Sequence, residues 1–222
     1  MQNIKFTDNA IKYIIFDMDG VLIDSVPITK KAVKIALAEI GIEPNNLDFT
    51  PYIGTGEKNF ILGPCKIFKK EPLAESAINR FYKIFDELAA KELVAYPSVL
   101  PLLETLRQKG LKLAIASSSA KAKVLSSLNA AHIPKDWFKT IITGDDVTFK
   151  KPSPEIYMSA INTLCAHPQN CLIVEDALSG ITSAKDAGAR CFGVSTSFNK
   201  DTLTKGGADF VGDDILEILD LI

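Results

Sequence analysis

Residues 13–20 read Tyr-Ile-Ile-Phe-Asp-Met-Asp-Gly, an apolar and aromatic run that ends in two acids and a glycine. Such a run is typical of a strand buried on both faces of a parallel sheet. Gly20 allows the chain to turn sharply after the strand. Because open parallel sheets bind ligands at the carboxyl ends of their strands, Asp17 and Asp19 stand where this fold class places its site.

The rest of the chain repeats this strand pattern, with helical periodicity in most of the intervals. One helix is expected over 99–109, with Ser98 as its capping residue and Gly110 at its end. Another is expected to follow Ser153, with Pro154 at its first position. This alternation indicates an α/β fold with a Rossmann-like, doubly wound parallel sheet. The strands are predicted at Tyr13–Phe16, Leu111–Ala116, Thr140–Ile142, Cys171–Val174 and Cys191–Val194, with a weaker one at Asp209–Val211.

One long segment departs from the alternation. Between about residues 27 and 94 the patterns are helical, and the clearest helices run over Pro27–Ile40 and Glu75–Leu93. We therefore expect a small α-helical cap domain inserted after the first strand. The predicted division is an α/β core domain of residues 1–25 and 95–222 and a helical cap domain of residues 26–94.

Chemically active side chains follow the ends of several predicted strands. Asp17 and Asp19 follow the first, Ser117 and Ser118 the second, Lys151 lies past the third, and Glu175 and Asp176 close the fourth. Strand ends of a parallel sheet share one edge, so these groups are expected to meet there. Four acids, two hydroxyls and a lysine are thus predicted at the edge where a parallel sheet places its site.

These motifs resemble the haloacid dehalogenase superfamily, in its capped phosphatase and phosphomutase branch. The resemblance extends over nearly the whole chain and implies that the first strand lies between the second and the fourth. It is carried by Phe-Asp17-Met-Asp19-Gly20-Val-Leu, the strand ending in Ser117, Lys151-Pro152, and Glu175-Asp176-Ala-Leu-Ser-Gly180.

The resemblance implies the roles of the acids. Asp17 would be the nucleophile that forms an aspartyl-phosphate, and Asp19 the general acid and then the general base. Mg²⁺ would be held by the side chains of Asp17 and Asp176 and by the backbone carbonyl of Asp19. Glu175 would bind a metal-bound water or serve as an alternative ligand. Solvated turns and helix caps also use acids after strands, which is the alternative for each acid taken alone.

The remaining core residues would bind the phosphoryl group. Ser117 and the backbone N–H of Ser118 would hold its oxygens, although Ser117 could instead cap a helix that begins near Ser119. Lys151 would neutralise charge on the nucleophile and the transferring group. Lys150 competes for that role, and the position directly before Pro152 favours Lys151.

The predicted cap contains a candidate specificity loop at residues 53–58, with the sequence Ile-Gly-Thr-Gly-Glu-Lys. Gly54 and a second glycine two residues later permit close approach of the backbone. Thr55, Glu57 and Lys58 supply polar groups that could contact the leaving group. An ordinary turn between helices is the alternative.

The favoured function is Mg²⁺-dependent hydrolysis of a small phosphorylated metabolite, such as a sugar phosphate, through an aspartyl-phosphate. A β-phosphoglucomutase-like phosphomutase is the alternative enzyme, but those mutases carry a histidine in the first cap helix, and residues 24–30 contain none. A phosphate-binding interaction protein need not keep both Asp17 and Asp19. Asp19 itself argues against a dehalogenase.

Composition limits the partners of the chain. Twenty-five Lys and Arg residues against 27 Asp and Glu give a formal charge of −2, which argues against a nucleic-acid binder. No apolar run approaches the ~20 residues that span a bilayer, and no secretory signal is recognisable at the start. A cytoplasmic monomer is the expectation.

Overall fold

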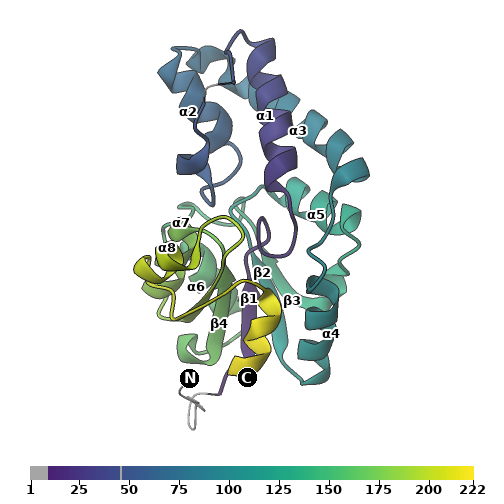
Figure 1. The fold of residues 1–222 in the computed structure, drawn as a ribbon, viewed down its shortest axis with the longest axis vertical. Coiled ribbons are helices and arrows are strands. Elements are labelled where there is room, and N and C mark those ends of the chain that lie inside the picture. The colour runs from purple at the N-terminus through teal and green to yellow at the C-terminus, as the bar shows by residue number, and fades with distance from the viewer. Residues whose placement is uncertain (1–9, 46) are drawn as a thin grey trace.

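The computed structural model describes residues 10–45 and 47–222 of the 222-residue chain (Figure 1). Residues 1–9 belong to the predicted core domain, and the absence of a secretory signal was inferred partly from them. Residue 46 belongs to the predicted cap. These ten positions lie outside the described residues.

The core is a sheet of six parallel strands in the order β3-β2-β1-β4-β5-β6. The predicted α/β class is confirmed, and β1 lies between β2 and β4 as expected. Phe16 at the end of β1 pairs with Ile115 and Val174, so the residues that follow these three strands emerge at one level. The strands are β1 (Tyr13–Phe16), β2 (Lys112–Ala116), β3 (Phe138–Ile142), β4 (Cys171–Glu175), β5 (Arg190–Val194) and β6 (Phe210–Gly212).

Helices cover both faces of the sheet because both faces are apolar. Alternate residues of β1 separate the two cores: Ile14 packs on one face and Ile15 on the other. One face is covered by α4 (Val99–Gln108), α5 (Lys121–Ala130) and the 3₁₀ helix η5 (Ile215–Leu221); the other is covered by α6 (Glu155–Thr163), α7 (Leu178–Asp186) and α8 (Lys200–Lys205). Short 3₁₀ turns lie at Lys135–Trp137 and Pro168–Asn170.

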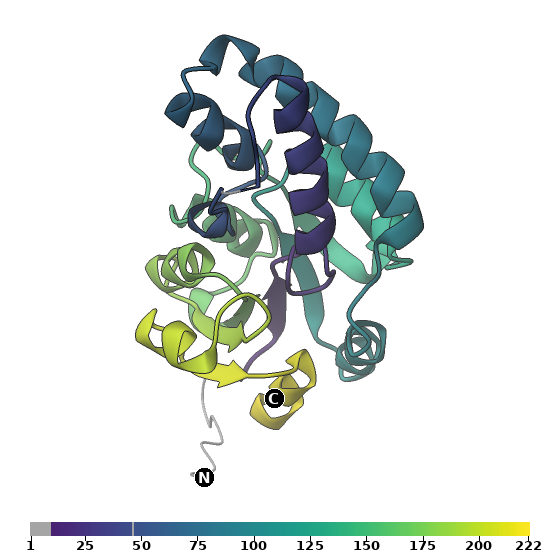
Figure 2. The same ribbon diagram turned by 45° about the horizontal axis from the view of Figure 1, so that its top comes forward.

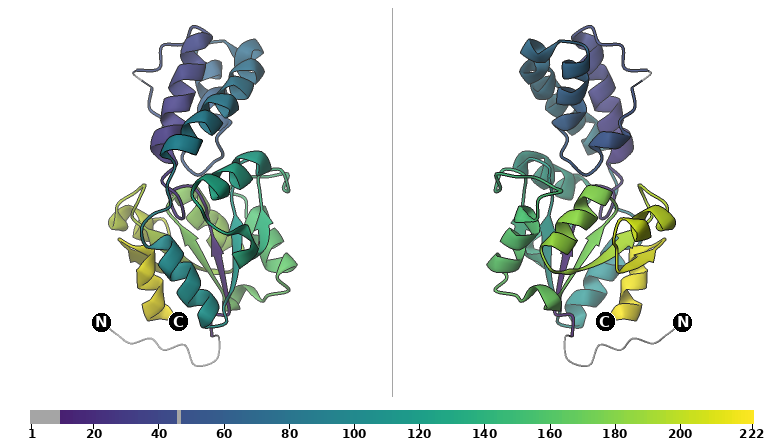
Figure 3. Two further views of the ribbon diagram at one scale, coloured as in Figure 1. Left: turned by 90° about the vertical axis from the view of Figure 1, so that its right-hand side faces the viewer. Right: turned by 90° about the vertical axis from the view of Figure 1, so that its left-hand side faces the viewer.

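The segment between β1 and α4 is helical, and it lies beyond the carboxyl ends of the strands (Figures 1 and 3). Its two long helices lie side by side, as Figure 2 shows. Buried residues of this segment, among them Phe81 and Phe85, continue the apolar cluster of one sheet face. The elements are α1 (Val26–Glu39), η1 (Thr50–Tyr52), α2 (Asn59–Ile67), η2 (Glu71–Leu73) and α3 (Ala74–Glu92).

The chain leaves and re-enters the core through two adjacent segments. Ile23 forms an antiparallel bridge with Ala95. The N–H of Asp24 donates to the carbonyl of Val94 at 3.2 Å, and the N–H of Tyr96 donates to a carbonyl of the outgoing segment at the same distance. The helical segment is therefore joined to the sheet by one short paired ribbon.

Ser98 stands at the N-cap position of α4 as expected, but its side chain makes no capping hydrogen bond, because its hydroxyl donates to Asp214 at 2.5 Å instead. Two local expectations are wrong. Pro154 occupies the N-cap position of α6, one residue before the helix begins. Strand β3 begins at Phe138, two residues before the predicted start, because the preceding 3₁₀ turn delivers that apolar side chain into the core.

Within the described residues, every helix is too short or too polar to cross a bilayer.

Candidate active site

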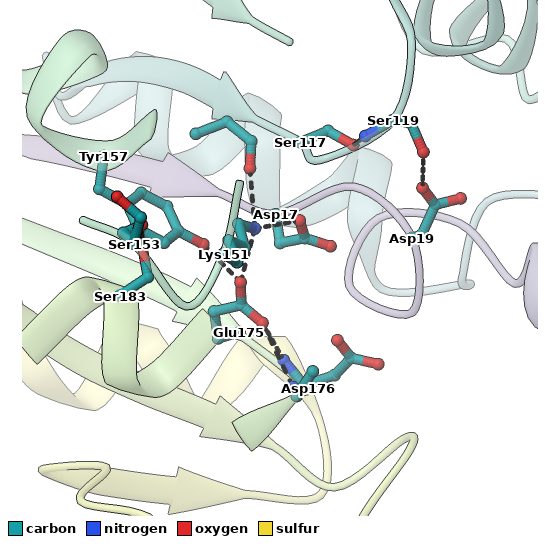
Figure 4. Close-up of polar contacts among 12 residues, drawn as sticks. Asp17, Asp19, Ser117, Ser119, Lys151, Ser153, Tyr157, Glu175, Asp176 and Ser183 are labelled. Atoms are coloured by element: carbon teal, nitrogen blue, oxygen red, sulfur yellow. Dashed lines mark hydrogen bonds and ion pairs between the residues drawn. The ribbon is translucent and has the colours of Figure 1, made fainter. Parts of the chain in front are cut away.

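Lys151 is the centre of a buried polar cluster at the carboxyl ends of β1, β2 and β4 (Figure 4). Its Nζ lies 2.5 Å from Oδ1 of Asp17 and 2.7 Å from Oε1 of Glu175, and it donates to the carbonyl of Ala116 at 3.0 Å. Burial lowers the pKa of Lys151, but the two carboxylates outweigh that effect and raise the pKa above its ordinary value. Lys151 is therefore a fixed cation beside Asp17.

Glu175 is held by hydrogen bonds on both carboxylate oxygens. Oε1 accepts from the Tyr157 hydroxyl at 2.5 Å, and Oε2 accepts from the backbone N–H groups of Asp176 and Ala177 at 3.1 and 3.2 Å. Gly180 leaves the space that this carboxylate occupies, since a Cβ there would lie 1.8 Å from Oε1. Tyr157 was not predicted from the sequence, because its helical spacing marks it only as a core residue.

Asp17, Glu175 and Asp176 form the one cluster of possible metal ligands found among residues 10–45 and 47–222. Their ligand oxygens all lie within 4.8 Å of one another. Burial raises the pKa of Asp17 to about 7, against the opposing effect of Lys151. Burial and the neighbouring carboxylates also raise the pKa of Asp176 well above its ordinary value. Crowded, buried carboxylate oxygens favour a hard divalent cation, which would offset this repulsion.

Asp19 turns away from that cluster and faces a second group of polar residues (Figure 4). Its Oδ1 accepts from the hydroxyl of Ser25 and lies 2.6 Å from Nζ of Lys123, and its Oδ2 accepts from the Ser119 hydroxyl at 2.7 Å. Burial raises the pKa of Asp19, but Lys123 and the hydroxyl donors outweigh that effect and hold the pKa below its usual value. The Asp19 side chain thus acts apart from the metal cluster.

Lys123 was missed in the sequence. It is a buried lysine on α5, and its Nζ also donates to Ser119 at 3.0 Å and lies 4.9 Å from the ring centroid of Phe85 on α3. Its sequence neighbour Lys121 is exposed, so composition alone does not separate the two. The available signal was spacing, because Lys123 lies four residues after Ser119 and four before the buried Ser127.

The strand-end serines lie in a cavity between the sheet edge and the helical segment. Ser117 accepts the N–H of Ser119 at 3.2 Å, and the hydroxyl of Ser118 is buried without a hydrogen-bond partner among the described residues. Lys150 donates to the carbonyl of Ser118 at 2.9 Å, so Lys151, and not Lys150, contacts Asp17. The cavity is lined by Asp17, Asp19, Ser25, Val26, Thr29, Ile53, Gly54, Gly56, Glu57, Phe60, Ser117, Ser118, Ser119 and Lys123.

The predicted specificity loop reaches this cavity only in part. Gly54 and Gly56 have positive φ and lie so close to the core that Cβ atoms would meet Ala177 at 2.7 Å and the carbonyl of Ser118 at 3.0 Å, respectively. Glu57 also lines the cavity. Thr55 and Lys58, the other two polar candidates of the loop, are not among the described residues that line the cavity. The Thr55 hydroxyl donates to the backbone carbonyl of Tyr52, and Lys58 is exposed.

The profile of the family described as haloacid dehalogenase-like hydrolase matches residues 14–194. A phosphoglycolate phosphatase of Pseudomonas putida is 32% identical over 201 residues, which cover 87% of this chain and 73% of that protein. The chloroplastic protein SUPPRESSOR OF QUENCHING 1 of Arabidopsis thaliana is 34% identical over 92% of this chain, and the chain spans only 20% of its length.

Solved structures share the same architecture. The crystal structure of CbbY from Rhodobacter sphaeroides in complex with phosphate superposes with a TM-score of 0.81 at 26% identity. The match covers 95% of this chain and 99% of CbbY.

Proposed function

The chain belongs to the haloacid dehalogenase-like hydrolase family, and on that premise we propose that it is a Mg²⁺-dependent phosphatase of small phosphorylated metabolites, such as sugar phosphates. The observation that carries this proposal is the pairing of Asp17 with the buried Lys151, beside two further carboxylates. One arrangement supplies a nucleophile, a fixed positive charge and a set of oxygen ligands. The phosphatase named among the relatives supports the reaction class.

The first chemical step is an in-line attack by a carboxylate oxygen of Asp17 on phosphorus. The bond from phosphorus to the leaving oxygen breaks, and Asp19, which enters this step protonated although Lys123 favours its charged form, donates its proton to that oxygen. Lys151 stabilises the negative charge between nucleophile and phosphoryl group. Ser117 and Ser118 line the cavity at a position suited to the phosphoryl oxygens.

In the second step a water molecule attacks the phosphorus of the aspartyl-phosphate. Asp19, left unprotonated by the first step, accepts a proton from this water, and the bond between phosphorus and the Asp17 oxygen breaks. Inorganic phosphate is released and the carboxylate of Asp17 is restored. Ser25, Ser119 and Lys123 orient Asp19 for both proton transfers.

Mg²⁺ would be held by Asp17 and Asp176, with the Asp19 carbonyl and Glu175 as further ligand candidates, and would neutralise charge between two anions. The buried cluster of three carboxylates supports this choice. The helical segment, taken as a cap domain of residues 26–94, would exclude bulk water from the cavity and contact the leaving group. Gly54, Gly56 and Glu57 line the cavity, which supports this role for them.

A metabolite-phosphate screen with Mg²⁺ and no bisphosphate primer tests the proposal. Stoichiometric release of inorganic phosphate supports a phosphatase. Isomerisation of a hexose 1-phosphate with little phosphate release would identify a phosphomutase instead. Saturable phosphate binding without turnover of any ester would identify a binding protein.

A further inference from the structure

Glu57 places a carboxylate in the cavity at the side formed by the helical segment. The residue is only 3% exposed, and it lines the same cavity as Asp17, Asp19 and Lys123. It therefore lies where the leaving group of a phosphate ester attacked by Asp17 would extend. The proposed function gives this carboxylate a contact with the leaving group but no proton transfer, and leaves open which leaving groups it accepts.

The two oxygens of Glu57 differ in their surroundings. Oε1 accepts from the N–H of Ala120 in the core at 3.0 Å and from the hydroxyl of Tyr82 on α3. Oε2 is buried and has no hydrogen-bond partner among the described residues. A buried carboxylate oxygen without a donor costs stability, so a ligand that supplies a donor gains by pairing with it.

The charges around the cavity decide which ligand groups fit. Lys123 is the one cation among the described lining residues, and its ammonium is already paired with Asp19. A second anionic group on the substrate would thus meet Glu57 without an unpaired cation among the described lining residues to neutralise it. Like charges brought together in a desolvated site cost several kcal/mol.

Given the phosphatase function proposed above, we infer that Glu57 is a specificity-determining residue that selects the leaving group. It accepts a hydrogen bond from a hydroxyl or ammonium group of the leaving group. It disfavours phosphate esters that carry a carboxylate or a second phosphate at that position. The substrate class is therefore a monophosphate ester of a polyol or amino alcohol.

Three esters of matched length test this inference: 2-hydroxyethyl phosphate, phosphoethanolamine and phosphoglycolate. They present a hydroxyl, an ammonium and a carboxylate, and kcat/KM for phosphate release is measured for each with Mg²⁺. We expect the better of the first two to exceed phosphoglycolate by at least ~10-fold, about 1.4 kcal/mol. Whichever of the two is faster identifies the donor.

Glu57→Gln removes the charge and keeps an oxygen that can accept from Ala120 and Tyr82. The preference over phosphoglycolate should fall by at least ~10-fold in this variant. Tyr82→Phe keeps the charge and removes one donor to Oε1, so it should retain the wild-type preference. Glu75→Gln removes an exposed charge of the same segment and serves as a matched control.

A residue that only fastens the cap to the core would lower all three kcat/KM values by the same factor in Glu57→Gln, and that result would overturn the inference. A wild-type preference for phosphoglycolate would also overturn it, even if the variant did not fold. Failure of the proposed function looks different, because the wild type would then release no phosphate from p-nitrophenyl phosphate either.

Discussion

Nζ of Lys123 lies 2.6 Å from Oδ1 of Asp19, although 104 residues separate them in the chain. The lysine is buried on α5, whereas the Asp19 side chain keeps a quarter of its surface exposed toward the cavity. The buried ammonium of Lys123 therefore fixes the carboxylate of Asp19, the proposed acid and base, from the interior of the protein. Phe85 of α3 packs over the same ammonium, which links the helical segment to Asp19.

Lys123→Met should lower kcat by ~10- to 100-fold, because Asp19 loses the partner that orients it for proton transfer. KM should change less than kcat, since Lys123 has no proposed contact with the phosphoryl group. Lys121→Met is the matched control, because Lys121 lies on the same helix and is exposed. Equal losses in the two variants would remove the positioning role from Lys123.

Asp17→Asn should reduce turnover by at least ~10³-fold, because an amide cannot form the acyl phosphate. Its thermal transition should barely move, since Lys151 keeps its ion pair with Glu175 at 2.7 Å. Asp186→Asn removes an exposed carboxylate and is the control for the loss of a charge. Turnover within tenfold of the wild type would show that Asp17 is not the nucleophile.

Asp19→Asn should slow both chemical steps by ~10²–10⁴-fold, as expected for loss of a positioned acid and base. With an activated ester such as p-nitrophenyl phosphate, the first step should slow less than with a sugar phosphate, because this leaving group needs little protonation. Phospho-enzyme should then accumulate, and acid quenching with labelled substrate should trap label on Asp17. If no label is trapped and Mg²⁺ affinity is lost, Asp19 belongs to the metal site instead.

Removal of divalent cations with EDTA should abolish hydrolysis, and Mg²⁺ should restore it. Ca²⁺ should inhibit, because its larger and looser coordination suits an in-line attack badly. Mg²⁺ should also raise the melting temperature of the wild type by binding only the folded state. Asp176→Ala should remove that shift, and full activity in a metal-stripped sample would contradict the mechanism.

Gly180→Ala should destabilise the fold by ~1–3 kcal/mol, the range for overpacking a filled site. A glycine-to-alanine change inside a helix ordinarily stabilises, but here the new Cβ would lie 1.8 Å from a Glu175 oxygen. Ser179→Ala, in the same turn of α7, is the control for a general change in helix propensity. Chemical denaturation of the two variants gives the comparison, and a stabilised Gly180→Ala would show that Glu175 moves freely.

The grouping of Asp17, Lys151, Glu175 and Asp176 was expected from their positions after predicted strands, because parallel strands deliver their ends to one edge. The place of β1 between β2 and β4 was implied by the family resemblance. The contacts of Asp19 could not be predicted in this way, because Lys123 lies within helix α5 and not at the end of a strand.

Residues 53–58 of the helical segment show the same limit to what a single sequence predicts. Gly54 and Gly56 were expected at a close contact and lie at one. Glu57, Lys58 and Thr55 were indistinguishable as polar loop residues, yet only Glu57 lines the cavity. Which of three neighbouring side chains turns inward depends on how the loop packs on the core, and a single sequence does not encode that packing locally.

The paired ribbon at Ile23 and Ala95 gives the molecule a modular plan. The chain between these two residues leaves and re-enters the sheet at one point, so its length can change without altering the pairing of the strands. Under the function proposed above, changes in that segment would alter the choice of leaving group while Asp17 and Lys151 keep their positions at the strand ends. A new selectivity therefore requires no new chemistry.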